Sequence, residues 1–90
     1  NLVEEATRAM RVANFLLAHE KLQEAFAIHD ENVEVLLAAA QLHLLWLKQG
    51  GMNEEIAARA KSYLATLEKL VPSHPKVMGF YKFLNELTGG

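Results

Sequence analysis

The chain contains no cysteine among its 90 residues. Disulfide cross-links and thiolate chemistry are therefore excluded, together with cysteine-based zinc fingers and the small secreted scaffolds that depend on disulfides. The same absence favours a reducing compartment, and we expect a cytoplasmic protein.

Proline and glycine are also scarce. Proline occurs twice and glycine five times, while alanine, leucine, glutamate and lysine, which are strong helix formers, dominate the stretches between them. No stretch alternates apolar and polar residues with the period of two that is typical of a strand. The sequence therefore predicts an all-α fold.

The chain has no excess of charge of one sign either. Its 9 basic and 11 acidic residues are interspersed, and the net charge is −2. Such a chain has no basic patch for nucleic acid or an anionic membrane, and we expect neither as a partner. The densest apolar stretch, residues 33–47, is shorter than the roughly 18 residues that cross a bilayer and is interrupted by Glu34, Gln41 and His43. It predicts a buried helix. Residues 1–90 form one domain, and a first residue other than methionine suggests a segment of a longer protein.

The apolar periodicity predicts five helices, over residues 2–12, 15–28, 33–49, 53–71 and 75–87. Residues 2–28 contain no glycine or proline, but their apolar stripe changes face near Ala13 and Asn14, which favours two helices over one unbroken helix. The helix over 33–49 is apolar almost all round, so neighbours must cover it on several sides. We expect Asn32, Asn53, and either Ser73 or His74, to cap helices.

A pattern of residues recurs after 42 positions. Self-similarity at a fixed offset is typical of stacked helix-pair arrays, which mostly bind other proteins. The first copy comprises Ala18, Leu22, Ala25, Ile28, Asp30 and Val35, and the second comprises Ala60, Leu64, Leu67, Leu70, Pro72 and Val77.

These residues resemble the tetratricopeptide repeat family. In that family an aromatic follows the turn of each helical hairpin, small residues mark the helix crossing, and a proline opens the next repeat. Departures are Ala13 in place of the turn glycine, Asp30 in place of proline, Glu5 in place of a large apolar residue, and an offset longer than about 34 residues. The matching positions are Phe15, Ala18, Leu22, Ala25 and then Ala60, Leu64, Leu67 and Pro72.

The resemblance implies antiparallel hairpins stacked into a short superhelix. Close crossings are expected where Ala6 meets Ala18 and where Ala39 or Ala40 meets Ala60. Eight extra residues between Leu44 and Arg59 predict one more turn on each arm of the second hairpin. Those longer arms would carry Trp46 and Met52 near an overhanging tip.

The resemblance also implies a partner-binding concave surface lined by the first helix of each repeat. The five residues predicted to contact a partner are Leu37, Gln41, Leu44, Lys76 and Phe83, and neighbouring positions on the same helices are Glu34, Leu45, Gly79 and Glu86. Family members that hold acidic chaperone tails use basic residues here, whereas this chain offers Glu34 and Leu37. An apolar or helical peptide is the expected ligand.

Residues that could carry chemistry are few. No two of His19, His29, His43 and His74 have the i, i+4 spacing of metal ligands on one helix, and His43 stands out because it lies on the apolar helix. The acidic pairs Glu4–Glu5, Asp30–Glu31 and Glu54–Glu55 adjoin helix ends, where carboxylates are favoured by the helix dipole. We expect no enzymatic activity, cofactor or metal.

The sequence thus predicts a module that binds another protein or peptide. The alternative is a homodimerisation or spacer domain of a multidomain regulator, such as a bacterial signalling protein. A small-ligand or enzymatic helical bundle is the third class, and it would require a pocket with converging polar groups.

Overall fold

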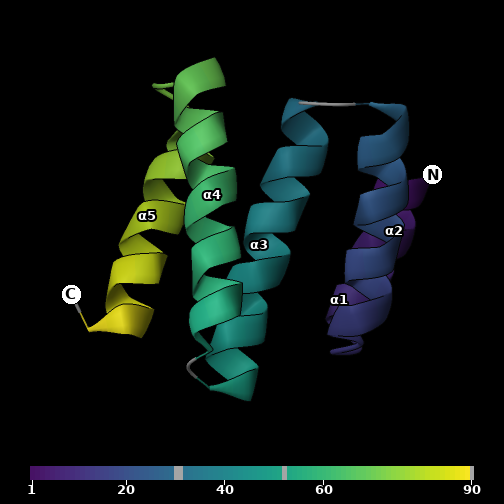
Figure 1. Ribbon diagram of the computed structural model, residues 1–90, viewed down its shortest axis with the longest axis horizontal. Coiled ribbons are helices and arrows are strands. Elements are labelled where there is room, and N and C mark those ends of the chain that lie inside the picture. Colours follow the sequence, from purple (N-terminus) through teal and green to yellow (C-terminus); the bar gives the residue numbers. More distant parts are fainter. Residues whose placement is uncertain (30–31, 52, 90) are drawn as a thin grey trace.

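The computed structural model describes residues 1–29, 32–51 and 53–89 as five α-helices (Figure 1). The described residues contain no strand, so the all-α prediction is confirmed. Each predicted helix boundary agrees with the structure to within one residue. The expectations for Asp30, Glu31 and Met52 lie outside the described residues. The helices are α1 (Leu2–Arg11), α2 (Phe15–Ile28), α3 (Val33–Gly50), α4 (Glu54–Leu70) and α5 (Pro75–Thr88).

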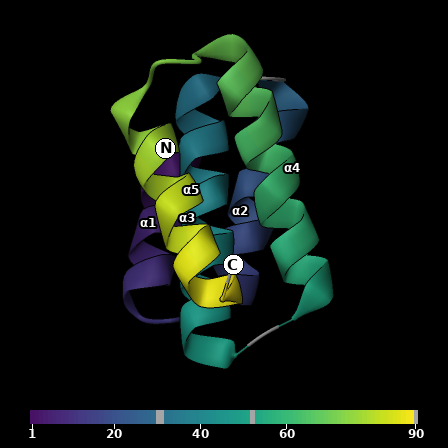
Figure 2. The same cartoon turned by 90° about the vertical axis from the view of Figure 1, so that its left-hand side faces the viewer.

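The helices form two antiparallel hairpins, α1 with α2 and α3 with α4, and α5 packs against α3 and α4. Figure 2 shows α1, α3 and α5 on one side of the molecule and α2 and α4 on the other. Helix α3 contacts all four other helices, which confirms the prediction that it is covered on several sides. Within the described ranges, no helix combines the length and the apolar character needed to cross a membrane.

Asparagine side chains cap the first four helices. The side-chain oxygens of Asn1, Asn14, Asn32 and Asn53 each accept a hydrogen bond from the backbone N–H three residues later. Such a bond satisfies one of the four amides that a helix start leaves without a partner. At α5 the cap is His74, whose Nδ1 accepts a hydrogen bond from the Lys76 N–H at 3.1 Å. Of the two caps expected for this helix, Ser73 and His74, the structure therefore shows His74.

The turn between α1 and α2 confirms that residues 2–28 form two helices. Ala13 has φ of 59°, the left-handed region that glycine usually occupies at a helix end. The Asn14 N–H donates to the Ala9 carbonyl and the Ala13 N–H to the Met10 carbonyl. This pair of bonds is a Schellman motif, which ends α1 without a glycine. Asn14 then caps α2, so three residues reverse the chain.

The core has two parts that share α3. One comprises residues of α1, α2 and α3, and the other residues of α3, α4 and α5. The alanines expected at helix crossings are all 0 % exposed: Ala6, Ala18 and Ala39 in the first part, Ala40 and Ala60 in the second. Small side chains at these positions let the helix backbones approach closely.

The second hairpin has the longer arms, as its extra residues predicted. Helices α3 and α4 have 18 and 17 residues, compared with 10 and 14 in α1 and α2. The C-terminal end of α3 therefore extends past the α1–α2 turn (Figure 1). Contrary to the prediction, Trp46 does not lie at an overhanging tip. It is half-buried beside both parts of the core, and its ring stacks on Phe15, the first residue of α2, with 5.9 Å between centroids.

Candidate interaction surface

Helix α3 is exposed along one narrow stripe. Glu34, Gln41 and Lys48 recur every seven residues, or two helical turns, and all three are exposed. Half-buried Leu37 and Leu45 flank them. Because His43 and Trp46 on the opposite side of α3 contact residues of α2 and α4, the stripe faces away from that layer.

Helix α5 presents a second stripe beside the first. Lys76, Gly79 and Glu86 are exposed, and Phe83 is half-buried against the core formed by α3, α4 and α5. The Nζ atom of Lys48 lies 5.9 Å from the centroid of the Phe83 ring, a cation–π contact that joins the two stripes. We call the two stripes together the α3–α5 face; its residues are Glu34, Leu37, Gln41, Lys48, Lys76, Gly79, Phe83 and Glu86.

Four of the five residues predicted to contact a partner lie on the α3–α5 face: Leu37, Gln41, Lys76 and Phe83. The fifth, Leu44, does not. It is 1 % exposed and belongs to the core between α3, α4 and α5, so it has no surface to offer a partner. On a helix that is covered on most sides, residues three positions apart can lie on either side of the boundary between core and surface.

Gly79 is the unusual member of this face. It lies inside α5, where glycine is less favourable than alanine by about 0.5–1 kcal/mol. A Cβ atom added at Gly79 would meet no atom within 4 Å, so the packing of this chain does not require a glycine there.

Two histidines meet between α2, α3 and α4. The imidazole of His43 (α3) is 0 % exposed and lies edge-to-face with that of His19 (α2), with 5.5 Å between ring centroids. Tyr63 of α4 covers His43 at 5.2 Å between centroids. The spacing of the histidines in the sequence did not predict this contact, because the i, i+4 rule applies only to two residues of the same helix. The apolar residues around His43 in the sequence were the one indication that this histidine is buried.

Burial sets the charge state of these histidines. The pKa of His43 is lowered to about 4, mainly by desolvation and also by the nearby His19 and Arg59, while the Ala39 carbonyl acts in the opposite direction. That carbonyl is 2.8 Å from Nδ1, so the neutral ring carries its proton there, and Nε2 is buried without a hydrogen-bond partner. Desolvation also lowers the pKa of His19. His43 is therefore uncharged near neutral pH.

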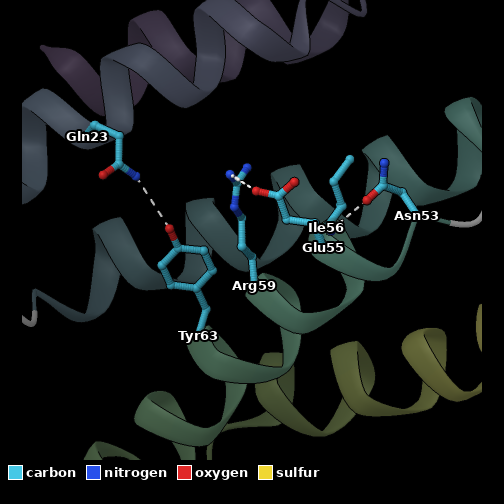
Figure 3. Close-up of polar contacts among 6 residues, drawn as sticks. All are labelled: Gln23, Asn53, Glu55, Ile56, Arg59 and Tyr63. Atoms are coloured by element: carbon cyan, nitrogen blue, oxygen red, sulfur yellow. Dashed lines mark hydrogen bonds and ion pairs between the residues drawn. The ribbon is translucent and has the colours of Figure 1, made fainter.

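The layer of α2 and α4 is held together by side chains over these histidines. The Gln23 side-chain amide donates to the Tyr63 hydroxyl at 3.4 Å, as Figure 3 shows. Phe26 stacks on the same tyrosine with 5.7 Å between centroids. Arg59 pairs with Glu55 on its own helix at 2.7 Å (Figure 3). Tyr63 thus connects α2 to α4.

The other two histidines lie outside this cluster, and the described residues contain no metal-binding group. His29 is exposed and His74 caps α5. Within residues 1–29, 32–51 and 53–89, no three of the histidine, aspartate and glutamate side chains are grouped so that they could hold a metal ion. No protein-family model, curated protein or solved structure matches the chain.

Proposed function

We propose that this domain is a protein-interaction module of the tetratricopeptide-like kind, which binds an amphipathic helix of a partner along the α3–α5 face. The observation that carries the proposal is the composition of this face, where Leu37 and Phe83 are half-buried beside exposed charged groups. Mixed apolar and charged stripes on adjacent helices suit an amphipathic helix laid along them.

The arrangement of the helices supports the same proposal. Two hairpins cross at fully buried alanines, and α1, α3 and α5 share one side of the molecule (Figure 2). In tetratricopeptide repeats, the helices at the corresponding positions line the ligand-binding surface. The proposed working compartment is the cytoplasm, as the cysteine-free composition favours.

Gly79 and Phe83 suggest how the ligand would sit. An exposed glycine lets a partner backbone approach α5 closely, as the alanines do at the crossings inside the fold. Phe83, one turn further along, supplies an aromatic contact area. The ligand helix would therefore carry one large apolar side chain over Gly79 and apolar neighbours beside Phe83.

A displayed library of amphipathic helices tests this proposal. We expect selected helices to bind the wild-type domain and to shift the amide NMR signals of α3 and α5. The Gly79→Glu variant should lose binding without losing stability, because the new side chain points into open space and improves helix propensity.

Ala65→Glu is the matched control, since it adds the same charge at an exposed position of α4. Equal affinity of both variants for the selected helices, or NMR shifts confined to α2 and α4, would contradict the proposal.

A further inference from the structure

The exposed stripe of α5 has the spacing of a coiled-coil seam. Lys76, Gly79, Phe83 and Glu86 follow one another at intervals of three, four and three residues. This is the alternation of the a and d positions of a heptad, which places all four residues on one side of the helix.

The seam is complementary to itself in antiparallel orientation. The midpoint between Lys76 and Glu86 is Tyr81, and the midpoint between Gly79 and Phe83 is the same residue. Two copies of α5 related by a two-fold axis near this residue would therefore place Lys76 opposite Glu86 and Phe83 opposite Gly79, each pair twice. Opposite charges would meet, and the largest side chain of the seam would lie over the smallest.

We propose that the helix bound on the α3–α5 face is α5 of a second copy of this chain, packed antiparallel about that two-fold axis. This inference rests on the proposed function, because it assigns an occupant to the same face. It accounts for Gly79, which the packing within one copy does not require.

The charges on α3 follow the same symmetry. Glu34 and Lys48 lie equally far from Gln41 along the exposed stripe. A two-fold axis that is perpendicular to the helices, parallel to the face and level with Gln41 would place Glu34 of one copy opposite Lys48 of the other. In the described part of the chain, none of Glu34, Lys48, Lys76 and Glu86 forms an ion pair, although Lys48 contacts the Phe83 ring. Within the described residues of one copy these four charges therefore have no oppositely charged partner.

Charge reversal at the seam gives the decisive experiment. Sedimentation equilibrium of the wild-type domain between about 1 µM and 1 mM, a range that brackets weak symmetric contacts, should show a monomer–dimer equilibrium. Lys76→Glu and Glu86→Lys should each weaken dimerisation about tenfold, because symmetry makes every reversal count twice. The double variant K76E/E86K should dimerise as the wild type does.

The two single variants should also complement each other. In a mixed dimer of K76E with E86K, each altered residue faces an opposite charge, so the equimolar mixture should dimerise more strongly than either variant does alone. All four residues of the seam are exposed or half-buried, and thermal melting by circular dichroism should show that both single variants remain folded.

A wild-type domain that stays monomeric over this range would overturn the inference, and so would a dimer that is insensitive to both reversals or a mixture that fails to pair. If selected foreign helices still bind the face of a monomeric domain, the inference fails and the proposed function stands. If the single variants dimerise weakly, their mixture pairs and no foreign helix binds, the face serves self-association and binding of other partners is refuted.

Discussion

The buried histidine of α3 should make the stability of this domain fall as the pH is lowered. The pKa of His43 is about 4 in the folded domain, compared with about 6.5 for an unperturbed histidine. Well above pH 6.5 the residue is neutral in both the folded and the unfolded chain and has no effect on their balance. Below that pH the unfolded chain binds a proton that the folded chain cannot, so the free energy of unfolding decreases.

The magnitude follows from the two pKa values. At pH 5 the linkage relation gives a loss of about 2 kcal/mol relative to pH 7, and near pH 4 the loss approaches about 3 kcal/mol. For a domain of this size such a loss is a large part of the total stability. Three neighbours from other helices face the ring: His19 from α2, and Arg59 and Tyr63 from α4. Trp46 of α3 itself also lies beside the ring. The two basic neighbours disfavour its protonation.

The assay is urea unfolding of the wild type and of His43→Leu at several pH values between 7 and 4.5. The leucine variant removes the titrating ring and its unpaired Nε2, so it should be at least as stable as the wild type at pH 7. Its advantage should grow by about 2 kcal/mol at pH 5. His19 and the carboxylates are present in both proteins, so the difference between the two curves reports His43. Parallel curves would refute the reasoning.

Three further substitutions test the local structure by urea or thermal unfolding. Ala13→Gly should stabilise the domain by about 0.5–1 kcal/mol, because glycine relieves the left-handed backbone at the α1–α2 turn; a loss of stability would contradict this turn geometry. Asn53→Ala should cost about 1 kcal/mol, since the Ile56 N–H loses its cap acceptor, whereas Asn53→Asp should retain most of the stability. Gly79→Ala should add about 0.5–1 kcal/mol to the stability of the isolated domain, and an unchanged or lower midpoint would reveal a contact that the structure lacks.

Local patterns were sufficient to predict the helices of this chain. Asparagine caps and the change of apolar face at Ala13 depend on neighbours within one or two turns, and both appear in the structure. The alanine crossings were also predictable, because a stacked pair of helices needs small residues where its backbones are closest.

Contacts between distant segments were not predictable in the same way. His19 and His43 lie on different helices, and their edge-to-face contact depends on how α2 rotates against α3. The burial of Leu44 depends on where α5 covers α3. Each of these features is set by the orientation of a helix about its own axis, and the apolar pattern of α3 is too continuous to fix that angle.

The 42-residue offset relates a buried face of α3 to a largely charged face of α5. Leu36, Ala40 and Leu44 of α3 are buried in the core that α3 shares with α4 and α5, and they correspond to Met78, Lys82 and Glu86 of α5.

Removing Lys82 and Glu86 from water against an apolar helix would cost more than leaving Met78 exposed. Helix α3 packs an apolar surface against α4. Helix α5 has no comparable apolar surface for a partner. It favours a partner whose charges can pair with its own, and an antiparallel copy of α5 supplies a carboxylate for Lys76 and an ammonium group for Glu86.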